Sequence, residues 1–187
     1  MSFKTSATKI IDTLDSIDKE KIDNCILKLA DRIVFAINNG GKVLICGNGG
    51  SAAEAEHFAA ELVCKFQKVR KALPAITLHS NIPTVTAIGN DFKFEDIFSR
   101  NLEAFGDKND ILIALSTSGN SQNVINALKL ANEMQIYSFT LTGNDGGVVK
   151  SISDDVFLVQ SNVVSTIQEI HLMFLHALCN EIDRNEF

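Results

Sequence analysis

The stretch Lys42-Val43-Leu44-Ile45-Cys46-Gly47-Asn48-Gly49-Gly50-Ser51 decides the fold class of this chain. Its first half is a short apolar run, which is typical of a strand buried on both faces of a parallel sheet. Its second half is a glycine-rich turn, and a helix is predicted after it over about 52–66. A buried strand, a glycine-rich turn and a helix together indicate the first unit of an alternating α/β protein.

The pattern extends in both directions from this unit. Apolar residues at positions 22, 26, 29, 33 and 37 predict a long helix that Gly40-Gly41 would end, and a shorter helical piece is expected over 10–17. Further strands are predicted over 75–78, 111–115, 137–141 and 156–159, with helices after 121 and over 166–183. Alternating strands and helices form right-handed crossovers, so we expect a five-stranded parallel sheet in a three-layer α/β/α sandwich. Ligands then bind beyond the carboxyl ends of the strands.

Size and composition limit the function further. A chain of 187 residues fits a single domain over 1–187. Its net charge is −6, and its densest basic stretch, 65–71, is more typical of a solvated helix end than of a polyanion site. No run of about 20 apolar residues and no signal-peptide core are present, and the four cysteines form no CxxC pair. We therefore expect a cytoplasmic protein with no nucleic-acid or membrane partner.

The closing helix is apolar on more than one face, as its residues Ile167, Ile170, Leu172, Met173, Phe174, Leu175, Leu178 and Ile182 indicate. So wide an apolar surface predicts packing against another subunit as well as the chain's own core. The N-terminal helical segment, about 1–39, is expected at the same oligomer interface. The alternative is a monomer with two deeply buried helices.

The glycine-rich turn, 47–51, is a candidate anion-binding loop. Its glycines allow the backbone to approach a ligand and to present N–H groups at a helix N-terminus. Gly47-x-Gly49-x-x-Ala52 also loosely matches the dinucleotide fingerprint, which requires an acidic residue at the end of the second strand. That strand ends in Leu78-His79-Ser80-Asn81, so the dinucleotide interpretation is disfavoured.

A second loop, Ser116-Thr117-Ser118-Gly119-Asn120-Ser121, follows the third strand and opens a helix. Four hydroxyl groups at a helix N-terminus can hold a phosphate monoester without Lys or Arg, because the helix dipole already favours an anion. Ser and Thr also cap helices, but a cap needs one such residue rather than four in six. We therefore expect this loop to bind phosphate.

Four further polar residues lie on two predicted helices. His57 and Glu61 are four residues apart, so they share one helix face and could share a metal ion or a substrate proton. A surface hydrogen-bonded pair is the alternative. Gln168 and His176 are eight apart, and spacing alone would not direct both to one ion. The pattern does not favour His176 over His171 either.

With these motifs in view, the chain resembles the phosphoheptose isomerases of the sugar isomerase (SIS) fold, which is flavodoxin-like. The resemblance runs nearly end to end. It rests on the two loops and on the segments His57-Phe58-Ala59-Ala60-Glu61-Leu62, Ile88-Gly89-Asn90-Asp91-Phe92, Phe98-Ser99-Arg100 and Ile167-Gln168-Glu169-Ile170-His171. The combination of the His57/Glu61 pair with Gln168 and His176 narrows the resemblance to the isomerases.

The resemblance implies an aldose–ketose isomerase that converts sedoheptulose 7-phosphate to D-glycero-D-manno-heptose 7-phosphate for lipopolysaccharide, capsule or another glycan. It implies that Glu61 is the catalytic base and His176 the acid. It also implies one zinc ion per subunit, bound by His57, Glu61, Gln168 and His176, in a homotetramer whose neighbouring subunits complete the pocket. The substrate-binding residues implied are Asn48, Gly49, Gly50, Ser51, Glu61, Asn90, Asp91, Ser116, Thr117, Ser118, Ser121 and Gln168.

Two positions depart from the pattern, since Lys65 and Thr166 stand where the family often has arginine. If those arginines hold the substrate, a lysine loses the bidentate geometry and a threonine loses the charge. A rival interpretation comes from another class of protein. A relative in the SIS family binds the bacterial replication initiator and is not known as an isomerase. A pure binding protein would not require Glu61 and His176.

Overall fold

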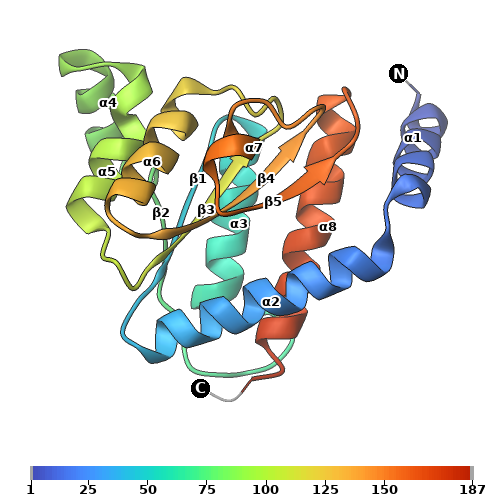
Figure 1. Cartoon of the computed structure of the whole chain (residues 1–187), viewed down its shortest axis with the longest axis horizontal. Coiled ribbons are helices and arrows are strands. Elements are labelled where there is room, and N and C mark those ends of the chain that lie inside the picture. Colours follow the sequence, from blue (N-terminus) through green and yellow to red (C-terminus); the bar gives the residue numbers. More distant parts are fainter. Residues whose placement is uncertain (1, 186–187) are drawn as a thin grey trace.

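The computed structural model describes residues 2–185, and it confirms the three-layer α/β/α architecture (Figure 1). Five parallel strands run in the order β2-β1-β3-β4-β5. The strands are β1 (Val43–Gly47), β2 (Ala75–Thr77), β3 (Ile111–Ser116), β4 (Tyr137–Gly143) and β5 (Asp155–Val159). The helices are α1 (Phe3–Ser16), α2 (Lys19–Asn38), α3 (Gly50–Val63), α4 (Ile82–Asp91), η1 (Phe94–Asp96), α5 (Ile97–Phe105), α6 (Gln122–Glu133), α7 (Val149–Ile152) and α8 (Val164–Ile182).

Two hydrophobic cores lie on opposite faces of this sheet. Alternate residues of β1 point to opposite sides, so Val43 and Ile45 pack with α2, α3 and α8, whereas Leu44 and Cys46 pack with α4, α5, α6 and α7. Every residue of β1 and of β3 is buried. Coverage of both faces explains why the central strands are continuous apolar runs.

The register of the central strands brings the two candidate loops together. β1 and β3 are neighbours, with Gly47 opposite Leu115, so both strands end at the same edge of the sheet. The glycine-rich turn leaves β1 there and opens α3, and the serine-rich loop leaves β3 there and opens α6. The structure thus confirms that both loops lie beyond the carboxyl ends of neighbouring parallel strands.

Three local expectations need correction. The helix after the first loop ends at Val63, not near residue 66. The basic stretch 65–71 is therefore a loop, and its Arg70 side chain is only 4% exposed. The helices α4 and α5 were not predicted, because both are short and Pro83 and Gly89 interrupt the pattern that precedes residue 91.

The terminal helices bury unequal amounts of surface. The apolar face of α8 is mostly buried within its own subunit, including Ile167, Phe174 and Leu178, while Met173 stays half exposed. The helix α1 has no buried residue, although Ile10 and Leu14 pack against the core. In Figure 1 this helix lies at the side of the molecule, beyond α8. The exposed apolar surface therefore lies on α1 more than on α8.

Candidate active site

The glycine loop is held in a conformation that only glycine adopts easily. Gly49 precedes α3 with φ of 55° and ψ of −120°, and it supplies no side-chain cap to the helix. A side chain at Gly47 would collide with the backbone of Ser51. The Ser51 N–H donates to the Asn48 carbonyl at 3.0 Å, which closes the turn. The loop therefore brings bare backbone to the N-terminus of α3.

The serine loop does not behave as an ordinary helix cap. Ser121 is the N-cap residue of α6, but its side chain accepts no hydrogen bond from the first turn of the helix. Its Oγ instead accepts a hydrogen bond from Ser116 Oγ at 3.3 Å. Ser118 Oγ accepts from the backbone N–H of Asn120, and Ser118 is exposed. The N-terminus of α6 thus keeps its capacity to bind an anion.

The loop that follows β4 supports the serine loop from behind. Gly119 has φ of 66° and lies against Gly146 so closely that a Cβ at Gly119 would overlap the Gly146 carbonyl. The Val149 N–H donates to the Gly119 carbonyl, and the Val148 N–H donates to Asn120 Oδ1. These bonds fix the loop's outline before any ligand binds.

Asn123, which the sequence did not single out, joins the two loops. Its side-chain Nδ2 donates to Asn48 Oδ1 at 2.8 Å, and Asn48 Nδ2 donates to Asn123 Oδ1 at the same distance. Asn123 is 2% exposed. Its position in the first turn of α6, two residues after Ser121, was the only sequence signal that could have drawn attention to it.

The structure brings together three of the four predicted zinc ligands. His57 Nε2 lies 2.9 Å from His176 Nε2 and 3.5 Å from Glu61 Oε1. The first two residues belong to α3 and α8 respectively, and Glu61 lies one turn beyond His57. The ring of Phe66 stacks on the His176 imidazole, with centroids 5.5 Å apart and planes 15° from parallel. The two imidazoles and the carboxylate can therefore act on one small group.

Gln168 lies at a different level of the same helix pair. Its side-chain amide packs so closely on Gly50, at the start of α3, that a Cβ there would collide with it. Because Gly50 contacts Gln168 and His57 contacts His176, α3 and α8 run side by side in the same direction (Figure 1). No hydrogen bond within residues 2–185 joins Gln168 to the two histidines. Gln168 therefore lies against the glycine loop and not beside the two histidines.

The geometry distinguishes the two histidines of α8. His171 is fully buried, and its Nε2–H donates to the Thr142 carbonyl at 3.2 Å. Burial lowers the pKa of His171 to about 4, although the Thr142 carbonyl opposes this effect. A buried, neutral imidazole cannot exchange protons with a substrate in the loops. Of the two histidines of α8, His176 is the one that lies beside His57.

Asn90 and Asp91 lie at the C-terminal end of α4, and both are exposed. Asn90 Nδ2 donates to Asp91 Oδ1 at 2.7 Å. No hydrogen bond within the described part of the chain connects either residue to the two loops. Lys65 is likewise exposed in the loop after α3, and Thr166 is 2% exposed in the first turn of α8.

Glu54 is a buried carboxyl group beside the glycine loop, which the sequence did not single out. It lies on α3 near Ser51, and both carboxylate oxygens are buried without a geometrically defined hydrogen-bond partner. Burial raises the pKa of Glu54 to about 7, nearby Glu169 raises it further, and a side-chain interaction with Ser51 opposes the rise. Within residues 2–185, no hydrogen bond satisfies either carboxylate oxygen, so nearby Ser51 offsets only part of the effect of burial.

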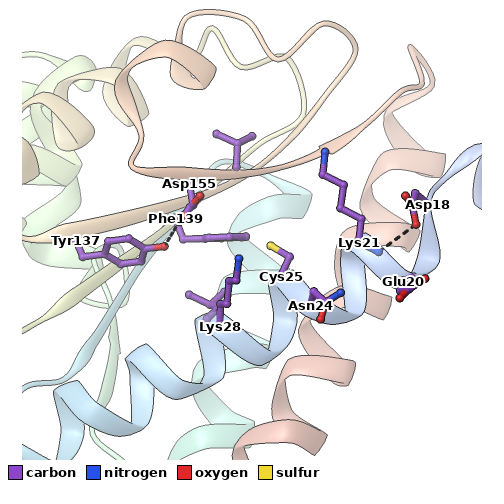
Figure 2. A pocket seen from close by; sticks show the side chains of 11 residues that line it. Asp18, Glu20, Lys21, Asn24, Cys25, Lys28, Tyr137, Phe139 and Asp155 are labelled. Atoms are coloured by element: carbon purple, nitrogen blue, oxygen red, sulfur yellow. Dashed lines mark hydrogen bonds between the residues drawn. The ribbon is translucent and has the colours of Figure 1, made fainter.

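A cavity of about 480 Å³ lies away from these residues, between α2 and the starts of β4 and β5 (Figure 2). Figure 2 shows Tyr137 donating its hydroxyl hydrogen bond to Asp155 there, at 2.8 Å, with Cys25 and Lys28 nearby. The strands begin at this edge of the sheet, whereas the two loops follow the strand ends, so the cavity lies at the edge opposite the loops. None of the predicted site residues lines this cavity.

The fold and the two loops define a SIS-domain protein, and residues 6–143 match the family model described as SIS domain. Phosphoheptose isomerase of Helicobacter pylori is 43% identical over 166 residues, which cover 89% of this chain and 86% of that protein. Phosphoheptose isomerase of Shewanella baltica is 45% identical and covers 98% of this chain and 94% of its own. Phosphoheptose isomerase GmhA of Neisseria gonorrhoeae superposes with a TM-score of 0.88 at 36% identity, over 96% of both chains. The chain belongs to the phosphoheptose isomerases, a family of isomerase enzymes within the SIS proteins.

Proposed function

We propose that this enzyme converts sedoheptulose 7-phosphate to D-glycero-D-manno-heptose 7-phosphate, as the first step toward a heptose precursor of surface polysaccharide. The observation that carries the proposal is the contact of His57 with both His176 and Glu61, beside two loops suited to a phosphorylated sugar. Relatives named phosphoheptose isomerase, matched over 86% and 94% of their own length, support a heptose phosphate as the substrate.

Aldose–ketose interconversion requires a base, an acid and stabilisation of an enediolate. In the proposed reaction the Glu61 carboxylate removes a proton from one carbon, His176 delivers a proton to the neighbouring carbon, and the hydroxyl proton passes from one oxygen of the enediol to the other. Glu61 then gives up its proton and His176 regains one, so both groups return to their starting states. Their separate helices support two distinct roles, because each group can reach the substrate from its own side. The stacked Phe66 ring restricts rotation of the His176 imidazole.

The substrate would bind through both loops. The hydroxyl groups of Ser116, Thr117, Ser118 and Ser121, together with the N-terminus of α6, would hold the phosphate. The sugar hydroxyls would contact Asn48, Gly49, Gly50 and Ser51, with Glu61 and Gln168 on the reacting side. Asn90 and Asp91 would join this set when a neighbouring subunit or the substrate closes the pocket.

We also propose one zinc ion per subunit, held by His57, Glu61, Gln168 and His176. Nitrogen and oxygen ligands of this kind suit zinc, and the Nε2 atoms of His57 and His176, 2.9 Å apart, would need to separate only slightly to bind one tetrahedral ion. Within residues 2–185, however, no three His, Cys, Asp or Glu side chains form a complete metal-binding group. Bound zinc would supply polarisation of the substrate oxygens. A Glu61 oxygen engaged by zinc would be a weaker base, so the other oxygen must stay free for the proton.

The proposed assembly is a homotetramer in the cytoplasm, with the N-terminal segment 1–39 at its interface. An apolar groove of about 330 Å³ between the N-terminal helices and α8 supports association, as does the exposed Phe3 on α1. No helix among the described residues could cross a membrane. Neighbouring subunits would enclose a site that lies open on the single chain.

The direct test is incubation of the purified protein with sedoheptulose 7-phosphate while NMR follows the aldose signal. We expect steady formation of the heptose aldose phosphate. Zinc content is measured on the same sample and on a His57→Ala variant, which should lose the metal. Absence of turnover in the parent protein at any zinc concentration would favour a binding protein of the SIS family instead.

A further inference from the structure

We propose that the buried Arg70–Asp183 ion pair positions the catalytic groups of α3 and α8 relative to each other. This inference rests on the proposed roles of Glu61 and His176. Within residues 2–185, no hydrogen bond joins either residue of the ion pair to the glycine loop, the serine loop or the side chains of Glu61 and His176. They act through the backbone at the ends of both helices and through the loop that carries Phe66.

Asp183 fixes the loop after α3 to the end of α8. It is the C-cap residue of α8, and its Oδ2 accepts hydrogen bonds from the backbone N–H groups of Gln67 and Lys68, at 3.1 and 3.0 Å. Burial alone would raise the pKa of Asp183, but these bonds and Arg70 outweigh it and lower the pKa. Asp183 thus remains an anion inside the protein.

Arg70 fixes the same loop to the end of α3. Its Nε donates to Asp183 Oδ1 at 2.8 Å. Its Nη2 donates to the carbonyl of Glu61 at 2.9 Å, and its Nη1 donates to the carbonyl of Leu62 at 2.8 Å. Carbonyl groups in the last turn of a helix have no partner within the helix, and a cation there also complements the helix dipole. Arg70 therefore holds the backbone of the proposed base itself.

Phe66 transmits this arrangement to the proposed acid. It lies immediately before the two amides that Asp183 binds, and its ring stacks on the His176 imidazole. The ion pair, with side chains 4% and 7% exposed, thus closes a ring of contacts that runs from Glu61 through Arg70 and Asp183 to the Gln67 amide, and from the adjacent Phe66 to His176. A displacement of about 1 Å at a reacting group can lower turnover by up to about a hundredfold.

The structure also provides a matched control on the same helix end. Arg184 follows Asp183 in the sequence and donates to Glu181 at 2.7 Å, but its side chain is 74% exposed. No hydrogen bond within residues 2–185 joins Arg184 to α3 or to the loop that carries Phe66. Arg184→Gln removes an arginine–carboxylate contact of 2.7 Å, close to the 2.8 Å of the Arg70–Asp183 contact, without affecting the ring of contacts.

The experiment compares Arg70→Lys, Asp183→Asn, Asp183→Glu and Phe66→Leu with Arg184→Gln. We expect kcat to fall about tenfold in Arg70→Lys and Asp183→Asn. KM should stay within about twofold, because the serine loop, which would hold the phosphate, lies between β3 and α6 and not on the helices that the ion pair joins. Asp183→Glu should recover part of the loss, since it restores the carboxylate. Arg184→Gln should match the parent.

A second measurement does not depend on turnover. The chain has four histidines, so the imidazole signals can be resolved by NMR at one fixed pH and assigned with a His176 variant. Phe66→Leu should move the His176 signal downfield, because the shielding of the stacked ring is lost. Arg70→Lys and Asp183→Asn should move it in the same direction, and Arg184→Gln should not.

The outcomes separate this inference from the proposed function. If the parent protein had no isomerase activity, the proposed function would be wrong. The NMR signal of His176 would still test whether the ion pair positions that side chain. Folded variants that lose thermal stability but keep both the parent kcat and the His176 signal would overturn the inference. If Asp183→Asn does not fold, Arg70→Lys decides the question, because lysine cannot reproduce the bonds of the arginine fork, and a parent-like kcat and His176 signal would refute the inference. A parent-like kcat in Phe66→Leu would remove Phe66 from the ring of contacts.

Discussion

The side-chain amides of Asn48 and Asn123 donate to each other's oxygens, at 2.8 Å in both directions. The glycine loop and the serine loop are therefore one connected surface, although 75 residues separate the two asparagines in the chain. Each amide uses its oxygen and one N–H on the other, so neither residue can be replaced without leaving polar groups of its partner unpaired.

Asn123→Ala should weaken substrate binding and stability together. The Asn48 amide would lose both of its hydrogen bonds to Asn123, which costs about 1–3 kcal/mol for a buried polar group and less for the half-buried Asn48. We expect KM for the heptose phosphate to rise several-fold as the loops separate. Thermal unfolding and steady-state kinetics measure both effects. Asn132→Ala is the control, because Asn132 lies on the same helix and bonds to Ile152 instead; an equal rise in KM there would contradict the prediction.

Glu61→Gln and His176→Ala should each lower kcat by about a hundredfold or more, as expected for lost proton-transfer groups. Circular dichroism should remain that of the parent. Glu56→Gln is the matched variant on α3, since Glu56 is exposed and its carboxylate points to His79 at 3.8 Å. Near-parental turnover in either Glu61→Gln or His176→Ala would remove that residue from the mechanism.

Ser121→Ala and Ser118→Ala should raise KM about ten- to a hundredfold and weaken inorganic phosphate binding in parallel, because hydrogen bonds to charged acceptors contribute about 1.5–3 kcal/mol each. Stability should change little in Ser121→Ala, since its side chain does not cap α6. Asn81→Ala gives the opposite pattern, because Asn81 Oδ1 accepts from Thr84 N–H and caps α4. It should lose about 1 kcal/mol of stability and keep phosphate affinity. If Ser121→Ala lost stability and kept its phosphate affinity, the serine loop would be a plain helix cap.

Glu54 should make the protein less stable as pH rises. Its pKa is about 7 in the folded chain and near 4.5 as the ordinary value, so the folded state holds a proton that the unfolded state has released between these pH values. The associated stability is fully present below pH 4.5 and is lost as pH rises through 7, up to about 3 kcal/mol. Urea unfolding of Glu54→Gln should show a smaller decrease between pH 5 and pH 8 than the parent. Identical pH slopes would contradict the prediction, and Glu56→Gln should retain the parental slope.

Light scattering at micromolar concentration should give a mass close to four times the 20.4 kDa subunit. Replacing Phe3 and Ile11 with serine should shift the population toward smaller species, because both side chains are more than half exposed on α1. Phe105→Ser provides a control, since Phe105 is also about half exposed but belongs to α5. A single 20.4 kDa species in the parent would exclude the tetramer.

The sequence predicted the sheet well because buried parallel strands carry a strong local signal. Val43–Cys46 and Ile111–Leu115 are uninterrupted apolar runs, and each ends in a loop whose composition is unusual. The pairing of His57 with Glu61 followed from helical spacing alone. Their approach to His176 could not be predicted that way, since it depends on the parallel packing of α3 and α8 across 119 residues of chain.

Other features had no pattern to reveal them. Arg70 belongs to a basic stretch that looked solvated, and its burial is caused by a partner 113 residues away. Asn123 and Glu54 are ordinary polar residues in helices, and burial distinguishes them from their neighbours. Such residues are identified by what surrounds them in space, which composition and periodicity do not encode.

The helix α1 has a consequence for how this subunit reaches its final form. A helix of 14 residues with no buried side chain is marginal in water by itself. In the proposed tetramer its order is completed by neighbouring chains, so part of folding becomes a reaction between molecules. Mass action then applies: dilution should release α1 first, and the apparent melting temperature should rise with protein concentration.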